Sequence, residues 1–229
     1  MELERDMIRQ YAGEAGRRYH DAVHGIPEKA YPWLARIRGD KFRGWIVSSD
    51  VVLEYGVGMG WNLARMRCER RLGYDLADHL EPVLERSGIE FVRDLNLVPD
   101  ASVDVVLCHH VLEHTANPPE VLAAIRRILK SGGRLILVVP HETGKKYHRY
   151  DPAEPNHHLY SWNVQTLGNL AGRCGFQIVQ ASMKRYGYDR FAAVWAERLR
   201  MGETGFRLLR SLLQRIIPLY EVFLVVRKP

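Results

Sequence analysis

Short apolar runs alternate with segments of helical period along the middle of the chain. The apolar runs predict strands at residues 51–55, 72–75, 89–95, 103–109 and 134–140. Residues 61–70 and 117–133 have a helical pattern, and the second stretch begins near a proline pair and ends at a glycine pair. Strands that alternate with helices form mostly parallel sheets covered on both faces. The pattern therefore predicts an α/β fold.

The pattern changes after residue 140. Residues 141–162 are polar and aromatic, which predicts a long loop over the edge of the sheet. A helix at 163–175 and a strand at 176–183 follow, and a last strand lies at 220–226. Between these two strands, residues 204–217 place arginines among apolar positions at helical spacing, which predicts an amphipathic helix.

We expect one domain, 1–229, made of three parts. Residues 1–47 are rich in aromatic side chains at a helical period and predict an N-terminal helical cap. Residues 48–183 hold the alternation of strands and helices and predict the core that carries the ligand site. Residues 184–229 predict a basic helical insertion followed by the final strand.

Three glycines stand at alternate positions directly after the first predicted strand, in VVLEYGVGMGWN. Glycine permits tight turns and close approach of a ligand to the backbone, and ligands of such sheets bind at the carboxyl ends of the strands. Gly56, Gly58 and Gly60 therefore predict a small-molecule cradle, with a plain strand–helix turn as the alternative. A dinucleotide fingerprint would need glycine at position 61, where Trp61 stands, so a nucleotide oxidoreductase is disfavoured.

The segments VLEYGVGMG, GYD, VRDL, VDVVLCHHVLEH and ILKSGGRLILVVP occur in the order and spacing of the class I S-adenosylmethionine-dependent methyltransferases, which this sequence resembles. The resemblance covers about residues 50–182. It implies a Rossmann-like, doubly wound sheet of seven strands with the last strand antiparallel, and S-adenosylmethionine as cofactor. Asp75 would accept hydrogen bonds from the ribose hydroxyls, and Asp94 would lie beside the adenine. The implied cofactor-binding residues are Glu54, Gly56, Gly58, Gly60, Asp75, Asp94, Leu95 and Cys108.

Histidines follow several of the predicted strands, at the edge where the ligand would bind. Methyl transfer to an oxygen needs an acceptor held in line and a base that removes its proton. His110 follows the fourth strand and is our first candidate for that base. His141, after the fifth strand, and His158, at the end of the long loop, are the other catalytic candidates.

The stretches HVLEH and HLYSW suggest an alternative role for some of these side chains. They resemble segments of two branches of the family, the ubiquinone-biosynthesis O-methyltransferases and the small-RNA 2′-O-methyltransferases, which bind a divalent metal there. That resemblance would make His110, Glu113, His114 and His158 metal ligands. The first position is histidine here rather than glutamate, which would favour zinc over magnesium. In other family members the Glu-His pair only fixes the turn by hydrogen bonds, so we predict no resident metal and keep the divalent ion as the less favoured alternative.

The net charge of +6 is confined to one part of the chain. Residues 183–229 contain ten Lys and Arg against four Asp and Glu, while the rest is balanced. A local basic feature disfavours nucleic acid as the partner. For the helix at 204–217 we favour packing on its own domain with a solvated basic face, and keep peripheral membrane contact as the alternative.

The remaining composition bounds the location of the protein. Cys68, Cys108 and Cys174 are odd in number and widely spaced, which predicts free thiols in a reducing compartment. The chain has no apolar run long enough to span a membrane, and its charged start lacks a signal-peptide core. We therefore expect a cytoplasmic protein without a transmembrane segment.

We predict a methyltransferase that acts on an oxygen of a small-molecule or glycan acceptor. Two alternatives remain open: a metal-assisted RNA 2′-O-methyltransferase, and a protein that binds the cofactor without catalysis. The sequence identifies neither the acceptor nor the oligomeric state.

Overall fold

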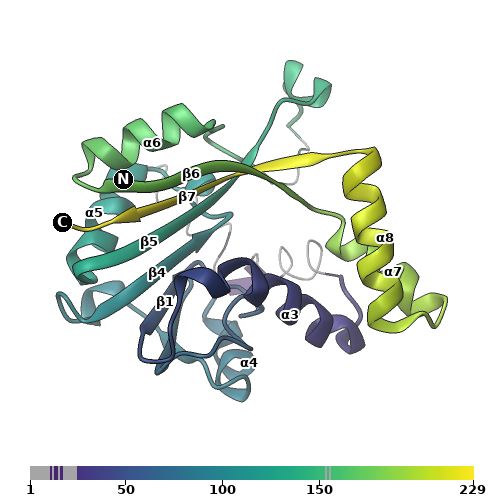
Figure 1. Cartoon of the computed structure of the whole chain (residues 1–229), viewed down its shortest axis with the longest axis horizontal. Helices are drawn as coiled ribbons and strands as arrows, with labels where there is room; N and C mark the ends of the chain where they lie inside the picture. The colour runs from purple at the N-terminus through teal and green to yellow at the C-terminus, as the bar shows by residue number, and fades with distance from the viewer. Residues whose placement is uncertain (1–10, 12, 15, 18–24, 153, 155) are drawn as a thin grey trace.

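A seven-stranded mixed sheet forms the centre of the molecule (Figure 1). The computed structural model describes residues 11, 13–14, 16–17, 25–152, 154 and 156–229. The strands lie in the order β3-β2-β1-β4-β5-β7-β6. Their bounds are β1 Val51–Tyr55, β2 Arg70–Tyr74, β3 Glu90–Val92, β4 Val103–His109, β5 Leu129–His141, β6 Gln177–Tyr186 and β7 Leu219–Arg227. The first five strands pair in parallel and β7 runs antiparallel to both β5 and β6, which confirms the predicted fold class.

Helices cover both faces of the sheet, as Figure 1 shows. The helices are α3 Tyr31–Phe42, α4 Glu81–Arg86, α5 Pro118–Ile128, α6 Val164–Arg173, α7 Asp189–Arg198 and α8 Gly202–Ile216. Short 3-10 helices are η1 Glu28–Ala30, η2 Arg43–Trp45, η3 Asp78–Leu80, η4 Leu95–Leu97, η5 Leu112–His114 and η6 Lys145–His148. One apolar core joins α5 and α6 to the sheet, and a second joins the end of α3, η3 and α4 to the opposite face. The alternation of side chains along each strand supplies both cores.

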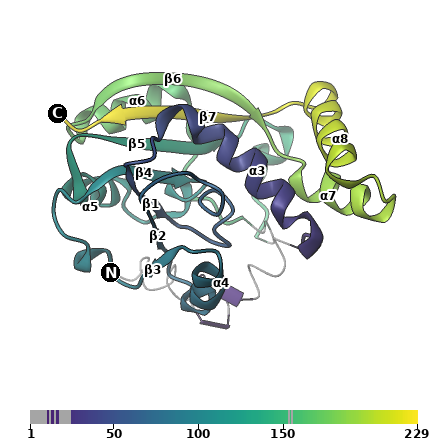
Figure 2. The ribbon, with the colours of Figure 1, turned by 60° about the horizontal axis from the view of Figure 1, so that its bottom comes forward.

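A third apolar cluster ties the cap to the insertion near the carboxyl end of the chain. The helices α7 and α8 lie side by side, and Figures 1 and 2 show them beyond the sheet, where α3 reaches them. The alanines of α7 and Phe206 of α8 pack with Leu34 of α3 and with Trp61. Most of the predicted helices before residue 25 lie outside the described residues, although residues 11, 13–14 and 16–17 are helical.

Two predicted helices differ from the structure. The prediction of a helix at 61–70 is wrong, because only a turn follows the glycines, closed by the N–H of Ala64 on the carbonyl of Gly60. Leu63 and Met66 of this segment lie in the same apolar core as Phe42 of α3, which stacks on Phe223 at 6.3 Å. The helix predicted at 117–133 ends at Ile128, because Leu129 is extended and begins β5.

The pattern analysis also missed α4 and α7. The helix α7 carries its buried positions as three alanines, Ala192, Ala193 and Ala196, which give a weak hydrophobic signal. Small side chains at these positions let α7 pack closely against α8 and η1.

Candidate active site

A cavity of about 1300 Å³ lies at the carboxyl ends of the parallel strands, where the sequence places the ligand. Residues of the glycine loop and the end of β2 form one part of its wall. Residues of α3, the end of β4 and the α7–α8 insertion form another. Predicted site residues in the lining are Glu54, Gly56, Gly58, Asp75, His110, Glu113, His114, His141 and His158.

The glycine loop has a backbone conformation that residues with a side chain rarely adopt. Gly56, Gly58 and Gly60 have φ of 74°, 50° and 71°. A Cβ on Gly56 would lie 2.2 Å from a methyl of Val111, in the cavity wall. A Cβ on Gly60 would instead lie 2.6 Å from Ile89, in the core. The first two glycines therefore shape the cavity, and the third lets the loop pack against the sheet.

Asp75, directly after β2, is hydrogen-bonded to the glycine loop. Its Oδ2 accepts the N–H of Gly58 at 2.8 Å, and its Oδ1 accepts the N–H of Ala77 at 3.0 Å. The carboxylate thus joins the glycine loop to the segment after β2 while it lines the cavity.

Glu54 lies buried in the cavity wall with one oxygen available. Its Oε1 accepts a hydrogen bond from Asn62, while Oε2 has no hydrogen-bond partner among the described residues. Burial raises the pKa of Glu54 to about 8. A ligand that places a cation or an N–H donor at the unpaired oxygen would lower this pKa and favour the ionised carboxylate.

Four of the predicted cofactor residues lie outside the cavity lining. Asp94 caps η4, where its Oδ1 accepts the N–H of Asn96 at 2.8 Å. Gly60 packs against the core that contains Leu84 and Ile89. Leu95 and Cys108 are buried in the core on the opposite face of the sheet, and burial raises the pKa of the Cys108 thiol. The structure therefore brings together only part of the set that the resemblance implies.

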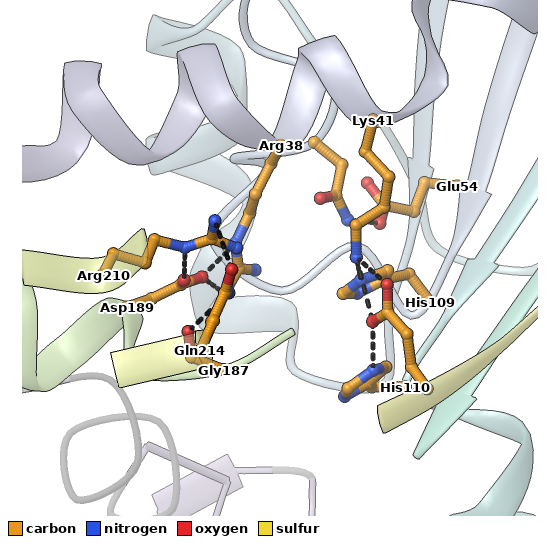
Figure 3. A network of polar contacts seen from close by, with 11 residues as sticks. Arg38, Lys41, Glu54, His109, His110, Gly187, Asp189, Arg210 and Gln214 are labelled. Atoms are coloured by element: carbon orange, nitrogen blue, oxygen red, sulfur yellow. Dashed lines mark hydrogen bonds and ion pairs between the residues drawn. The ribbon is translucent and has the colours of Figure 1, made fainter. Parts of the chain in front are cut away.

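A buried polar cluster joins α3, the end of β4 and β7 (Figure 3). The Nζ of Lys41 lies 2.8 Å from Oε1 of Glu221 and donates to Nε2 of His109 at 2.9 Å. The Nε2 of His110 lies 3.2 Å from Oε2 of Glu221. The two histidine rings stack at 4.4 Å, and the backbone of His110 has a φ of 55°, which turns the chain sharply at the end of β4.

The charges of this cluster set its protonation. Burial lowers the pKa of His110, and the contact with Glu221 counters only part of that shift, so the imidazole is neutral at neutral pH. Burial alone would raise the pKa of Glu221, but Lys41 and His110 hold it below its ordinary value. Burial also lowers the pKa of Lys41. A neutral imidazole oriented by a carboxylate can accept a proton.

A second set of charges links the cap to the insertion, also seen in Figure 3. Asp189, the first residue of α7, lies between Arg38 of α3 at 3.2 Å and Arg210 of α8 at 2.7 Å. Burial alone would raise the pKa of Asp189, but the two arginines lower it. Arg38 also lies over the ring of Trp61 at 5.2 Å from its centroid. These contacts fix one wall of the cavity.

Glu113, His114 and His158 form a separate cluster that His110 does not join. Their ligand atoms all lie within 4.8 Å of one another. Burial raises the pKa of Glu113 to about 8 and lowers that of His114 to about 3. Burial would lower the pKa of His158, but its Nδ1 lies 2.7 Å from Glu142, and the net shift is upward. Of the four side chains in the less favoured metal alternative, the structure brings three together, whereas His110 groups with His109 and Glu221.

The third catalytic candidate, His141, has a different neighbour. Its Nδ1 donates to the carbonyl of Trp162 at 2.9 Å, which ties the end of β5 to the end of the long loop. His141 lines the cavity but belongs to neither cluster.

Residues 24–181, well over half of the chain, match the family model described as a methyltransferase domain. The chain belongs to the class I S-adenosylmethionine-dependent methyltransferase family. The glycine loop after β1 and Asp75 after β2 are both within the matched residues. The sequence analysis did not single out Lys41 or Glu221. Lys41 lines the same cavity, and Glu221 lies buried behind it, in contact with Lys41 and His110.

Curated relatives of this methyltransferase differ in the acceptors that their names state. The ubiquinone biosynthesis O-methyltransferase of Xanthomonas oryzae pv. oryzae is 33% identical over 99 residues, which is 38% of this chain and 41% of that protein. The human thiol S-methyltransferase TMT1B is 32% identical over 97 residues, 37% of this chain and 40% of that protein. The chain therefore spans about two fifths of the length of these relatives.

Solved structures of methyltransferases support the fold. A methyltransferase of Thermotoga maritima, described as a possible histamine N-methyltransferase, superposes with a TM-score of 0.61 at 16% identity, over 99% of this chain and 100% of that one. A methyltransferase of Bacillus halodurans gives 0.60 at 17% identity, over 87% and 98%. Within the described residues, no helix is long and apolar enough to cross a membrane.

The residues present fit the family cofactor and also a metal ion. The free oxygen of Glu54 and the positive-φ glycines offer a cationic ligand a carboxylate and a bare backbone. Neither carboxylate oxygen of buried Glu113 has a hydrogen-bond partner in another described residue. Together with His114 and His158, it forms a donor set of one carboxylate and two imidazoles, which suits a divalent transition metal.

Proposed function

We propose that this protein transfers a methyl group from S-adenosylmethionine to an oxygen of a small-molecule or glycan acceptor. The observation that carries the proposal is that His110, in the cavity lining, lies 3.2 Å from the buried carboxylate of Glu221. A thiol or amine acceptor can lose its proton with less help, whereas a hydroxyl acceptor gains most from a positioned base. The relative named for O-methylation of a ubiquinone precursor supports the same choice.

The residues of the chain have distinct roles in this reaction. Gly56, Gly58 and Asp75 hold the cofactor against the carboxyl ends of β1 and β2, and Glu54 accepts from its donor groups. The cofactor, when bound, would supply a methyl group on a positively charged sulfur, which would leave as a neutral thioether when the acceptor oxygen takes the methyl group. The cavity aligns the two reactants and limits access of water.

His110 removes the proton of the acceptor hydroxyl. Its Nε2–H donates to Glu221, which leaves the lone pair on Nδ1 to accept the proton. Glu221 stabilises the resulting imidazolium, and Lys41 keeps Glu221 ionised in its buried position. The pair therefore works as base and orienting carboxylate.

The test compares acceptors and variants in one assay. Purified protein and labelled S-adenosylmethionine are incubated with a catechol, a simple glycoside, an alkyl thiol and an amine. We expect transfer to a hydroxyl acceptor, and a loss of about 100-fold in kcat for His110→Gln. His148→Gln, a change in an exposed histidine of the long loop, serves as the control. Transfer to the thiol or amine alone, or full activity of His110→Gln, would contradict the proposal.

A metal-assisted reaction on a hydroxyl, including an RNA 2′-hydroxyl, is the second candidate. The unpaired carboxylate of Glu113 beside His114 and His158 favours it. A divalent ion held by these three residues would lower the pKa of a hydroxyl bound next to it. This candidate predicts that a chelator abolishes activity and that added metal restores it, whereas His110→Gln would then keep most of the activity.

A further inference from the structure

The helix α8 exposes a row of large apolar side chains. Leu208, Leu212 and Ile216 follow one another at intervals of four residues and are 63%, 54% and 66% exposed. This row is called the α8 stripe. On the buried side of the same helix, Phe206 packs with α3 and α7, so α8 already has its place in the fold without the stripe. The stripe is a second apolar surface that no described residue covers.

The neighbouring elements extend this apolar character. The helix α7, which packs beside α8, exposes Phe191, Trp195 and Leu199, again at intervals of four residues. Tryptophan favours the boundary between water and lipid, because its ring is largely apolar and its indole N–H is polar. Because large apolar side chains are exposed on both helices, we attribute a function to the surface formed by α7 and α8 together.

The charges around the pair are strongly positive. Every acid in residues 183–229 already forms an ion pair: Asp189, Glu197, Glu203 and Glu221. Among the described residues, five exposed arginines of this region form no ion pair: Arg185, Arg198, Arg200, Arg215 and Arg227. Three of them, Arg198, Arg200 and Arg215, belong to α7, α8 or the turn between them. The surface thus combines apolar side chains with uncompensated positive charge. Two copies of it would repel each other, whereas an anionic surface would attract it.

We propose that the α8 stripe and these arginines dock the protein on an anionic lipid surface. The apolar side chains would enter the boundary between head groups and acyl chains, and the arginines would pair with lipid phosphates. The helix lies along the surface in this arrangement and does not cross the membrane.

The segment directly after α8 lines the cavity. The helix α8 ends at Ile216, and Pro218, Leu219 and Tyr220 line the cavity directly after it. Leu219 and Tyr220 are also partly exposed to solvent. Docking on α8 would therefore bring a lipid surface close to one wall of the cavity. An acceptor dissolved in that lipid could then enter from this side, a consequence that rests on the proposed function, whereas the docking itself does not.

The test measures binding of the purified protein to vesicles by co-sedimentation. Vesicles of phosphatidylcholine alone are compared with vesicles that also contain phosphatidylglycerol. We expect about tenfold more protein on the anionic vesicles, and loss of that binding in Leu208→Ser/Leu212→Ser. The matched control is Val47→Ser/Leu97→Ser, which removes two side chains of similar exposure, 54% and 76%, away from α8. Arg200→Gln/Arg215→Gln should weaken binding to anionic vesicles only.

Two readouts keep the test independent of folding and of methyl transfer. Circular dichroism and binding of S-adenosylhomocysteine show whether the variants keep the fold and the cofactor site. The proposal is overturned if the wild-type protein fails to bind anionic vesicles, or if the control variant loses binding as much as the stripe variant. It is also overturned if light scattering shows a dimer that the stripe variant dissociates while vesicles bind neither form, because a second copy would then be the occupant.

Discussion

Lys41 and Glu221 form a buried ion pair, with Nζ 2.8 Å from Oε1, although 180 residues separate them in the chain. The pair joins the helix before the first strand to the last strand of the sheet. Because Glu221 has no exposed side-chain surface, its charge depends on this partner. The pair therefore connects the stability of the fold to the ionisation of the proposed catalytic cluster.

Replacing Lys41 should destabilise the protein strongly. In Lys41→Met the carboxylate of Glu221 stays buried without its cation, and we expect the free energy of unfolding to fall by about 3 kcal/mol. Lys41→Met/Glu221→Gln should recover a large part of that loss, because no buried charge remains. Lys29→Met, which removes an exposed ion pair with Glu197, should change stability by about 0.5 kcal/mol or less. Urea titration of the four proteins measures these differences, and equal losses in the two single variants would contradict the interpretation.

Asp75 should determine affinity for the cofactor. Asp75→Ala removes a carboxylate that lines the cavity and also frees the N–H groups of Gly58 and Ala77, so the loop loses its anchor. We expect the Kd for S-adenosylhomocysteine to rise about tenfold or more, measured by calorimetry. The exposed Asp78, three residues later, provides the matched change Asp78→Ala, which should bind with wild-type affinity. Unchanged affinity of Asp75→Ala would place the cofactor elsewhere.

The central half of the fold could be predicted from apolar runs alone. Two strands match the predicted bounds, 51–55 and 103–109, because a buried parallel strand is a short continuous apolar run with clear ends. The end of α5 is less predictable from the sequence. Leu129 continues the helical spacing of apolar residues, although its backbone is extended and already belongs to β5. Hydrophobic periodicity does not encode where hydrogen bonding changes from a helix to a sheet.

The cofactor half of the site followed from the sequence, but the proposed catalytic half did not. Gly56 and Gly58 directly follow β1, and Asp75 directly follows β2. A short sequence motif is therefore enough to locate them. Lys41 resembles a surface lysine in its own segment, and its role depends on β7 inserting between β5 and β6. A weak signal was present in Glu221, a single acid within the apolar run YEVFLVV, where an ionised side chain needs a partner.

The pH dependence of methyl transfer should report the state of His110. A base must be neutral to accept a proton, and the pKa of His110 lies below its ordinary value of 6.5. Activity should therefore rise with pH below 6.5 and be constant at neutral pH. Glu221 raises the pKa of His110, so Glu221→Gln should move the rising limb to lower pH and lower the plateau. Profiles of kcat/KM for the two proteins test this, and a limb that moves to higher pH would exclude His110 as the titrating base.

Gly60 should contribute to stability more than to cofactor binding. Its φ of 71° and the close approach to Leu84 and Ile89 mean that Gly60→Ala strains the backbone and crowds the core. We expect a loss of about 1–3 kcal/mol in thermal or urea unfolding, with little change in affinity for S-adenosylhomocysteine. Gly44→Ala is the control, because nothing lies within 4 Å of the added Cβ. A large loss of affinity at unchanged stability would return Gly60 to the cofactor site.

Glu113 should decide between the base-assisted and the metal-assisted reaction. Its pKa of about 8 in the absence of a ligand means that the side chain is mostly protonated at neutral pH. Because this pKa lies above the ordinary 4.5, the folded protein keeps a proton on Glu113 that the unfolded chain releases, so stability falls as pH rises from 4.5 to about 8 and the loss is complete above that pH. Glu113→Gln should therefore make the metal-free protein less sensitive to pH within this interval, as measured by urea unfolding. A bound divalent ion would favour the ionised carboxylate of Glu113 and so reverse this loss of stability. Metal analysis, together with unfolding in the presence and absence of a chelator, therefore distinguishes metal-bound from metal-free protein. If stoichiometric metal is lost in Glu113→Gln but kept in His110→Gln, the ion binds at this cluster and the metal-assisted reaction is favoured. If a chelator neither destabilises nor inactivates the wild-type protein, the base-assisted reaction with His110 and Glu221 is favoured.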